Sequence, residues 1–295
     1  MGVISGEKMV LVEMTGGLGN QMFQYALYRK LLELNKDVYL DTSFFRSGQK
    51  LREFELERFD LELRVMPDRE VDRLRGYSYQ SSFFKKLRFK LCSAKLSVYQ
   101  DKIEYFQPAI FEMDDVYLQG YWQNEKYFAD IRDTIKRELF FAPEMRIQKK
   151  KCLERMQNEN SVSVHIRRGD YLDPQNQKVY GNICTADYYK NAVTYIREQI
   201  SNPVFIVFSD DMDYAKTLIN GDDVCYIDKD EKEDVYTDMY LMTQCRHHII
   251  ANSTYSWWGA WLTENEETIT VCPERWFANH DQADVACERW IRIKP

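Results

Sequence analysis

The sequence predicts an α/β protein with two lobes, the second of them Rossmann-like, and three observations support this. The chain has 295 residues, which is near the upper limit for one hydrophobic core, so two domains are expected. Short apolar segments alternate with segments of helical spacing, a pattern typical of parallel sheets covered by helices. A polar, lysine-rich stretch at residues 141–160 separates two runs of this pattern. The predicted lobes are therefore residues 1–155 and 156–295.

The first lobe begins with a strand, a glycine-rich turn and a helix. Residues 9–14 are mostly apolar, residues 15–20 include three glycines, and residues 21–34 have apolar side chains at helical spacing. Residues 38–40 are expected to form the next strand. Residues 41–75 are rich in charge and interrupted by a glycine and a proline, so we predict no element there.

The second lobe repeats strand and helix several times. Residues 161–166 alternate as a strand does, residues 186–200 have helical spacing, and residues 203–208 are continuously apolar, as in a buried parallel strand. The alternation continues through helix 212–219, strand 224–227, helix 234–244, strand 248–251, helix 255–262 and strand 268–272. This order predicts a parallel sheet with helices on both faces.

Composition and charge exclude several classes of protein. The formal net charge is −7, so the chain has no overall attraction to nucleic acid. Seven cysteines are scattered without a close pair, which fits neither a disulfide framework nor a zinc site. No stretch has the 18 or so apolar residues that span a bilayer, and the first residues do not resemble a signal peptide. We expect a cytoplasmic protein with reduced thiols.

Three loops follow predicted strands of the second lobe, where ligands of open α/β sheets bind. The first contains Arg167 and Arg168, and guanidinium groups match phosphate oxygens in two-point hydrogen bonding. The third contains Ser253 and Thr254 at an expected helix N-terminus, where backbone N–H groups favour an anion. These two loops suggest a diphosphate site. A solvated turn is the alternative for the arginines.

The second loop contains Ser209, Asp210 and Asp211. Its carboxylates can accept hydrogen bonds from a ribose hydroxyl or from guanine. Taken alone, the same residues can simply cap the helix that follows. Both interpretations stay open at this stage.

The glycine-rich turn of the first lobe holds Gly17, Gly19, Asn20 and Gln21. It is not a dinucleotide fingerprint, because Met22 stands where the last glycine is required, and no phosphate loop with Lys-Ser or Lys-Thr is present. The glycines allow a ligand to approach the backbone closely. Asn20 and Gln21 are expected to contact the ligand through their amides.

Four segments together resemble the motifs of the α-1,2-fucosyltransferase family: GGLGNQMFQYA from Gly16, HIRRGDY from His165, FSDD from Phe208 and NSTYSWWGAWL from Asn252. The resemblance implies a GT-B fold, with two Rossmann-like lobes and the active site in the cleft between them. It also implies GDP-fucose as donor, inversion at the fucose, and no metal or other cofactor. The acceptor it implies is the 2-hydroxyl of a terminal β-galactoside, carried by an oligosaccharide or a lipid-linked glycan.

The resemblance also assigns roles to residues. Arg167 resembles the arginine that stabilises the departing diphosphate, and His165 with the Asp210-Asp211 pair resembles the nucleoside contacts. Asp170, next to the arginines, is the candidate general base, with orientation of Arg168 as its alternative role and Glu13 as a second candidate. The predicted donor-binding residues are Gly17, Gly19, Asn20, Gln21, His165, Arg167, Arg168, Ser209, Asp210, Asp211, Asn252, Ser253, Thr254 and Ser256.

Two patterns that suggest metal binding are expected to be structural. Asp211 and Asp213 form a D-x-D pattern, but Asp213 should lie on a helix, and the two arginines can neutralise a diphosphate. His247 and His248 have no suitably spaced third ligand. We therefore expect no metal site.

Alternatives remain for linkage, catalysis and location. A GDP-fucose transferase of α-1,6 or protein O-linkage, or a non-catalytic GDP-sugar or glycan-binding protein, would use a similar donor site. A further hypothesis is that the protein contacts the inner surface of the membrane, which would bring a lipid-linked glycan close. This hypothesis rests on a segment that interleaves basic with apolar residues: Phe83, Phe84, Lys85, Lys86, Leu87, Arg88, Phe89, Lys90, Leu91 and Lys95. The alternative is that the segment forms a helix packed on its own lobe.

Overall fold

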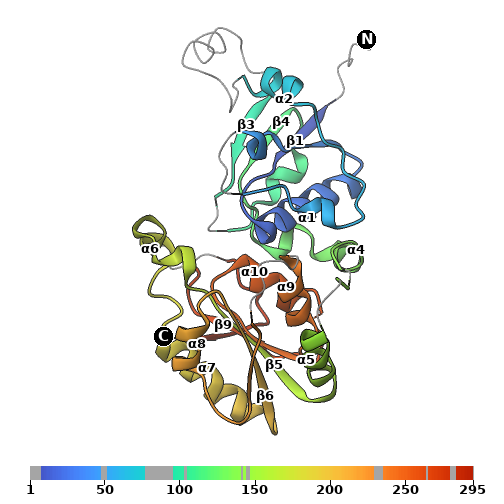
Figure 1. The fold of residues 1–295 in the computed structure, drawn as a ribbon. Coiled ribbons are helices and arrows are strands. Elements are labelled where there is room, and N and C mark those ends of the chain that lie inside the picture. Colours follow the sequence, from blue (N-terminus) through green and yellow to red (C-terminus); the bar gives the residue numbers. More distant parts are fainter. Residues whose placement is uncertain are drawn as a thin grey trace. The chain divides into compact units, whose positions relative to one another are not determined.

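The chain forms two compact units, Met1–Leu139 and Phe140–Pro295, which are drawn in Figure 1. The computed structural model describes residues 8–47, 52–76, 96–102, 105–140, 142–143, 147–228, 235–263, 265–279 and 284–294. The basic segment at residues 83–95 lies outside this part. The predicted boundary between residues 155 and 156 falls within α5 (Ile147–Asn158), which contacts β5 of the second unit.

Unit 1 is built on a parallel sheet of four strands in the order β2-β1-β4-β3. The strands are β1 (Met9–Glu13), β2 (Asp37–Asp41), β3 (Ser97–Gln100) and β4 (Val116–Gln119). Its helices are α1 (Leu18–Glu33), α2 (Asp68–Arg75), α4 (Arg132–Glu138), η1 (Ser43–Arg46), η2 (Leu56–Arg58), η3 (Pro108–Glu112), η4 (Glu125–Tyr127) and η5 (Ala129–Ile131). The predicted strand, glycine turn and helix are confirmed.

Two local differences from the prediction have physical reasons. Helix α1 begins at Leu18 rather than Gln21, because only Gly16 takes a positive φ, +79°, and Gly17 already serves as the N-cap. Residues 41–75, for which no element was predicted, contain η1, η2 and α2. Helix α2 is strongly charged, yet Val71 and Leu74 pack with Leu11 of β1 in one buried cluster, so a narrow apolar face is enough to dock it.

Unit 2 is built on a parallel sheet of six strands in the order β10-β9-β8-β5-β6-β7. The strands are β5 (Asn160–Ile166), β6 (Pro203–Ser209), β7 (Val224–Tyr226), β8 (His247–Ile249), β9 (Thr270–Pro273) and β10 (Ile291–Ile293). Its further helices are η6 (Gly169–Leu172), α6 (Pro174–Tyr180), α7 (Ala186–Gln199), α8 (Met212–Leu218), α9 (Tyr236–Thr243) and α10 (Thr254–Trp261). The predicted alternation is confirmed; α5, η6, α6 and β10 were not predicted.

Both faces of the unit 2 sheet are buried, which explains the continuous apolar character of β6. Phe205 and Val207 face the cluster that contains α7 and α8, whereas Ile206 and Phe208 face the cluster that contains α5 and α9. Successive side chains of a strand point to opposite faces, so a strand covered on both sides has no solvent-exposed face that would favour polar residues. The α/β class with two Rossmann-like lobes, as the GT-B fold has, is thus confirmed.

None of the helices in the described part of the chain has both the length and the apolar character needed to cross a bilayer. Six cysteines lie in this part and are free thiols, while Cys92 lies outside it.

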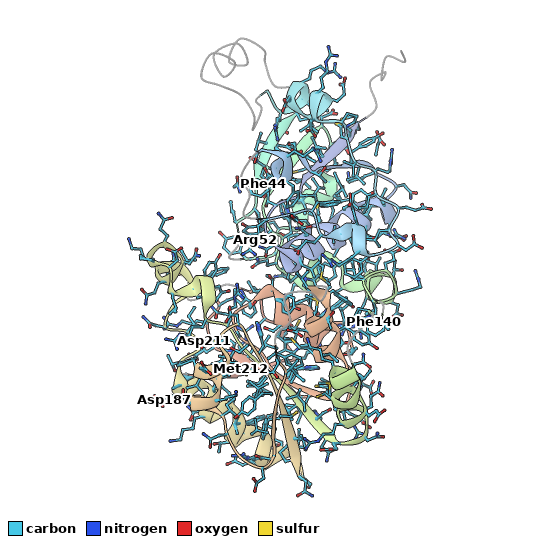
Figure 2. All side chains as sticks on the ribbon, in the orientation of Figure 1. Phe44, Arg52, Phe140, Asp187, Asp211 and Met212 are labelled. Carbon is cyan, nitrogen blue, oxygen red and sulfur yellow. The ribbon has the colours of Figure 1, made fainter. Side chains whose placement is uncertain are left out.

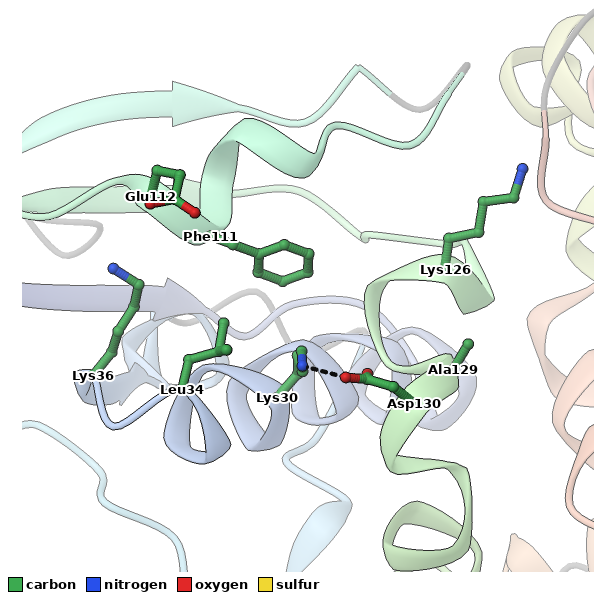
Figure 3. A pocket seen from close by; sticks show the side chains of 8 residues that line it. All are labelled: Lys30, Leu34, Lys36, Phe111, Glu112, Lys126, Ala129 and Asp130. Atoms are coloured by element: carbon green, nitrogen blue, oxygen red, sulfur yellow. Dashed lines mark hydrogen bonds and ion pairs between the residues drawn. The ribbon is translucent and has the colours of Figure 1, made fainter.

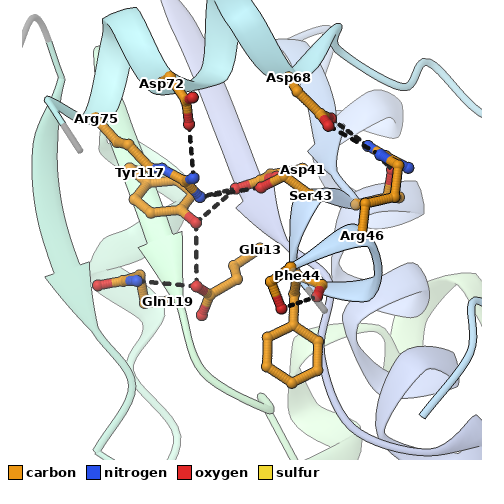
Figure 4. A network of polar contacts seen from close by, with 12 residues as sticks. Glu13, Asp41, Ser43, Phe44, Arg46, Asp68, Asp72, Arg75, Tyr117 and Gln119 are labelled. Atoms are coloured by element: carbon orange, nitrogen blue, oxygen red, sulfur yellow. Dashed lines mark hydrogen bonds and ion pairs between the residues drawn. The ribbon is translucent and has the colours of Figure 1, made fainter. Parts of the chain in front are cut away.

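A buried ion pair ties α2 to the sheet of unit 1 (Figure 4). Arg75 Nη1 lies 2.8 Å from Asp41 Oδ2, and both side chains are fully buried. Arg75 also donates to Ser43 Oγ at 3.1 Å and binds Asp72 at 2.8 Å. Tyr117 of β4 lies 2.8 Å from the same Asp41 oxygen. A charge buried this deeply is tolerated only because every neighbour is a hydrogen-bonding partner.

Replacing Arg75 by methionine is expected to lower the free energy of unfolding of unit 1 by about 3–5 kcal/mol, since Asp41 then stays buried without its cation. The matched control is Arg73→Met on the same helix. Arg73 pairs with Glu70, and both side chains are about half exposed, so its loss should cost about 0–1 kcal/mol. Urea unfolding followed by circular dichroism measures both. Equal effects of the two changes would contradict the role given to the buried pair.

Candidate functional site

The sheet order of unit 2 brings the three predicted loops together. Strands β8, β5 and β6 are neighbours and run parallel, so their carboxyl ends lie at one edge of the sheet. The loops at Arg167 and Asp210 follow β5 and β6 directly, and Asn252 lies three residues after the end of β8. This is the edge at which α/β sheets bind ligands.

Asp210 joins the first loop to the second. Its Oδ2 lies 2.6 Å from Arg167 Nη1, and its Oδ1 accepts a hydrogen bond from the Arg168 backbone N–H at 2.8 Å. A Cβ atom at Gly169 would lie 2.6 Å from Asp210 Oδ2, so a glycine is needed where the first loop passes the carboxylate. The Arg167 side chain is 27% exposed. A partly exposed guanidinium fixed by a carboxylate can face an anion in a set orientation.

Arg168 is held by a different set of contacts. Its guanidinium carbon lies 3.9 Å from the centroid of the Tyr214 ring, and its Nε lies 3.5 Å from Asp211 Oδ2. Both arginines thus lie against α8 and the loop before it, rather than extending into solvent. Both guanidinium groups thus lie at this edge of the sheet, and the predicted diphosphate site stays a prediction.

The second loop also has the structural role that the sequence left open. Asp211 caps α8 by accepting a hydrogen bond from the Tyr214 N–H at 3.1 Å, and Figure 2 shows Asp211 and Met212 at the start of this helix. Ser209 Oγ lies 2.9 Å from the Ile166 carbonyl oxygen and accepts from the Asp211 N–H at 3.0 Å. The Ser209 contacts hold the end of β6 against the end of β5. Ser209 and the two aspartates therefore stabilise the loops of the site through internal hydrogen bonds.

His165 lies beside the arginines with its ring buried. Burial, aided by the charge of Arg167, lowers the pKa of His165 to about 3, so the imidazole is neutral at physiological pH. Within the described residues its Nδ1 has no hydrogen-bond partner. A buried polar atom without a partner is costly, so His165 is one of the few buried side chains of this edge whose hydrogen-bonding capacity is not used within the described chain.

The third loop divides into internal and outward-facing residues. The Asn252 amide donates to the Tyr180 and Trp276 carbonyl oxygens at 3.2 and 3.1 Å. Ser256 is also buried, and its Oγ lies 3.3 Å from the Ser253 carbonyl oxygen. The structure thus places these two predicted donor-binding side chains inside unit 2, where they hold the loop.

Ser253 and Thr254 stand at the N-terminus of α10. Ser253 is the N-cap residue, and its side chain makes no capping hydrogen bond. Backbone N–H groups of the first helical turn have no intrahelical acceptors, and the helix dipole is positive there. This end of α10 can therefore bind an anion at the same sheet edge as the two arginines.

The glycine turn belongs to unit 1 and is held by its own amides. Gln21 is fully buried; its Nε2 donates to the Gly16 and Glu53 carbonyl oxygens at 2.9 Å each, and its Oε1 accepts from the Glu55 N–H at 2.8 Å. Gln21 therefore fixes the turn and does not present its amide, contrary to expectation. Asn20 is half-buried, and its Oδ1 accepts from Gln123 at 2.9 Å.

The backbone around Gly17 is nevertheless closely approached by another side chain. A Cβ atom at Gly17 would lie 3.7 Å from Arg52 Nη1, and Gly19 is buried inside the first turn of α1. Arg52 was not among the predicted site residues. Its segment carries no motif, and only the fold brings it to the glycine turn.

A second group that the sequence did not reveal surrounds Glu13 at the carboxyl edge of the unit 1 sheet (Figure 4). Glu13 Oε1 lies 3.1 Å from Tyr117 Oη and accepts from Gln119 Nε2 at 3.0 Å. The same tyrosine hydroxyl lies 2.8 Å from Asp41 Oδ2. Its single proton is thus shared between two carboxylates. Glu13 and Tyr117 are 104 residues apart, so no local pattern could indicate this contact.

The remaining predicted residues are placed only in part. Asp170 lies in η6, but its side chain is outside what the structure describes. Asp213 lies on α8 as expected. In the described ranges, no three His, Cys, Asp or Glu side chains are grouped as metal ligands. His248 is buried in the sheet, 2.8 Å from Ser163 Oγ, and is structural as predicted.

Comparison with known proteins places this arrangement in a family. Residues 99–294 match the family described as Glycosyl transferase family 11. An alpha-1,2-colitosyltransferase of Escherichia coli is 35% identical over 298 residues, covering 97% of this chain and 99% of that protein. Galactoside alpha-(1,2)-fucosyltransferase 1 of Aotus azarae is 29% identical over 154 residues, covering 49% of this chain and 42% of that protein.

Among solved structures, a mutant of Arabidopsis thaliana FUT1 in complex with GDP superimposes with a TM-score of 0.49 at 15% identity, covering 91% of this chain and 71% of that one. The family match and the full-length relative agree with the motif resemblance. The chain therefore belongs to glycosyl transferase family 11, the α-1,2-fucosyltransferase family, and is a glycosyltransferase.

Proposed function

We propose that the protein transfers L-fucose from GDP-fucose, with inversion, to the 2-hydroxyl of a terminal β-galactoside. The observation that carries the proposal is the fixed arrangement of Arg167 and Arg168 around Asp210 at the carboxyl edge of β5 and β6. In a glycosyltransferase of this family, such an edge suits a nucleotide diphosphate. The acceptor rests on the family resemblance and on the name of the Aotus relative.

In this mechanism the main task of unit 2 is to stabilise the leaving group. As the bond between fucose and the β-phosphate breaks, negative charge builds up on the phosphate. Donors that are already oriented stabilise this charge without reorganising. Arg167, held by Asp210, and the N-terminus of α10 are the proposed donors. Neutral His165 is assigned to the nucleoside as a hydrogen-bonding group, with Arg168 beside it.

The acceptor hydroxyl must lose its proton as it attacks the fucose from the opposite side. A carboxylate within hydrogen-bond reach can take this proton. Asp170 is our first assignment, because it lies only two residues after Arg168 in the sequence. Glu13 is the second, since Tyr117 and Gln119 orient its carboxylate at the sheet edge of unit 1.

Colitose is a second candidate for the transferred sugar, because the full-length relative is named as a colitosyltransferase. Colitose is fucose without its 3-hydroxyl. The two donors would share every contact to the nucleotide, so the arginine site does not distinguish them. Only groups around the 3-position of the sugar can do so.

The Arg167 proposal is tested by GDP release from GDP-fucose and lactose, measured in EDTA. Wild type should release GDP only with lactose, and EDTA should have no effect, because Arg167, Arg168 and α10 replace a metal. Arg167→Ala should lower kcat by about 10²-fold to 10³-fold. Arg197→Ala, which removes an exposed pair with Asp223, should keep wild-type activity.

A loss in EDTA that Mn²⁺ restores would contradict the metal independence. Near-normal turnover by Arg167→Ala would contradict the leaving-group role. GDP binding without turnover for any sugar acceptor would favour a non-catalytic binding protein.

The general base is identified by the pH profile of kcat/KM. Loss of the base should lower kcat by about 10²-fold to 10⁴-fold and abolish the acidic limb of the profile. We expect this for Asp170→Asn, whereas Glu13→Gln should keep the limb. The reverse result would transfer the role to Glu13, and a limb retained in both variants would exclude both carboxylates.

Donor choice is measured by competition between GDP-fucose and GDP-colitose. A site that hydrogen-bonds the 3-hydroxyl should prefer fucose by about 10⁴-fold in kcat/KM, because colitose leaves the polar group unpaired. An apolar site separates the two by only about 10²-fold. We expect the fucose preference, and a preference for colitose would refute it. NMR of the product checks the linkage to the 2-hydroxyl.

A further inference from the structure

Unit 1 has a second concave site, a hollow of about 610 Å³ beside α1. It is formed by the C-terminal part of α1, the turn after it, and the short helices η3, η4 and η5. Figure 3 shows Phe111 in the middle of the hollow, with Lys36 toward one end and Lys126 toward the other. Its volume is in the range of small-molecule sites in proteins.

The hollow runs along α1 and away from the glycine turn. Lys126 is three residues after Gln123, whose amide donates to Asn20 at the start of α1. At the other end, Lys36 lies beyond the last turn of the helix. Since an α-helix rises 1.5 Å per residue, Lys30 is already about 18 Å along the axis from Leu18. A ligand that has one end at the glycine turn must therefore be an extended chain to reach the hollow with its other end.

The charges of the hollow are balanced. Lys30 Nζ lies 2.5 Å from Asp130 Oδ2, and Lys36 Nζ lies 3.0 Å from Asp114 Oδ1. Glu112 adds another carboxylate to the lining, and Lys126 adds another ammonium. Paired charges of both signs give little net attraction to an anion. They do offer donors and acceptors side by side, which suits hydroxyl groups, because each hydroxyl both donates and accepts.

Phe111 supplies an aromatic surface among these polar groups. Phe106 and Tyr127 pack against its ring with centroids 6.2 Å away in each case, and Figure 3 shows the ring projecting into the hollow. The face of an aromatic ring carries negative partial charge. The C–H face of a pyranose carries the opposite polarity, so the two surfaces attract. The Lys30 ammonium lies 5.9 Å from the centroid of the Phe111 ring. An aromatic ring with charged donors and acceptors in the same lining is thus complementary to a sugar.

We propose that this hollow is a second carbohydrate-binding site, which binds a neutral oligosaccharide. The proposal rests on the proposed function for one point, that the bound chain is the part of the acceptor glycan remote from the modified galactose. Binding there raises the local concentration of the reactive end. The expected consequence is a lower KM for long neutral acceptors than for a disaccharide, with similar kcat.

Kinetics with a short and a long acceptor test the consequence. Lactose and the neutral, galactose-terminated lacto-N-tetraose are compared in wild type and in two variants. Phe111→Ala, and separately Glu112→Gln combined with Lys126→Gln, should raise KM for the tetrasaccharide by about tenfold, as for loss of one good aromatic contact. Neither should change kcat/KM for lactose. The double variant alters exposed side chains only, which guards against misfolding. Tyr105→Ala, on an exposed tyrosine of the same unit, is the control and should match wild type.

A direct binding measurement separates this proposal from the proposed function. A diazirine derivative of lacto-N-tetraose is photolysed with the full chain, and the labelled peptide is identified by mass spectrometry. Labelling of the peptide that contains Phe111 and Glu112 is expected in wild type and in Arg167→Ala, and its loss is expected in Phe111→Ala.

Labelling without any turnover would support the hollow while contradicting the proposed function. Turnover of the tetrasaccharide without labelling, and with unchanged KM in the variants, would contradict carbohydrate binding in the hollow and leave the proposed function standing. Inorganic diphosphate and excess unlabelled tetrasaccharide are tested as competitors of the labelling. Displacement by the diphosphate alone would contradict the carbohydrate site and indicate an anion site.

Discussion

The proposed donor site depends on one carboxylate, Asp210. It accepts from the backbone of Arg168 and binds the side chain of Arg167, so a single residue fixes both the path of the first loop and the direction of the guanidinium. Without it, two adjacent arginines would repel each other and lose much of their orientation in solvent. A leaving group gains most from donors that are oriented before charge develops. A partly buried carboxylate can therefore be useful in a site for anions, because it orients the cations.

The same principle, with opposite charge, organises the edge of the other sheet. In unit 1 a buried cation, Arg75, holds Asp41, and Asp41 shares the hydroxyl proton of Tyr117 with Glu13. The result is a carboxylate edge rather than an arginine edge. Within unit 1 these contacts hold Glu13 and Asp41 at the carboxyl ends of β1 and β2, just as Asp210 holds Arg167 at the carboxyl end of β5 in unit 2.

Much of the fold could be predicted from the sequence because hydrophobic periodicity is a local property. The strands and helices of unit 2 follow from it, and so does the meeting of three loops at one edge, since parallel strands share their carboxyl ends. The contacts of Arg52, Tyr117 and Gln119 could not be predicted, because they join segments that no motif relates. Helix α2 escaped prediction because only Val71 and Leu74 mark its apolar face.

The motif residues fall into two groups, according to whether their side chains are hydrogen-bonded within their own unit. Gln21, Asn252 and Ser256 stand in the segments that resemble the family, yet each is buried and satisfied within its own unit. Such residues shape a loop, and their replacement would misplace the donors beside them. Ser253 and Thr254 differ, since they stand at the N-terminus of α10, although Ser253 is itself buried. His165 differs because its Nδ1 lacks a hydrogen-bond partner within the described chain. A shared motif therefore fixes the position of a residue, while its burial and its bonds decide whether it contacts the substrate or supports a neighbour that does.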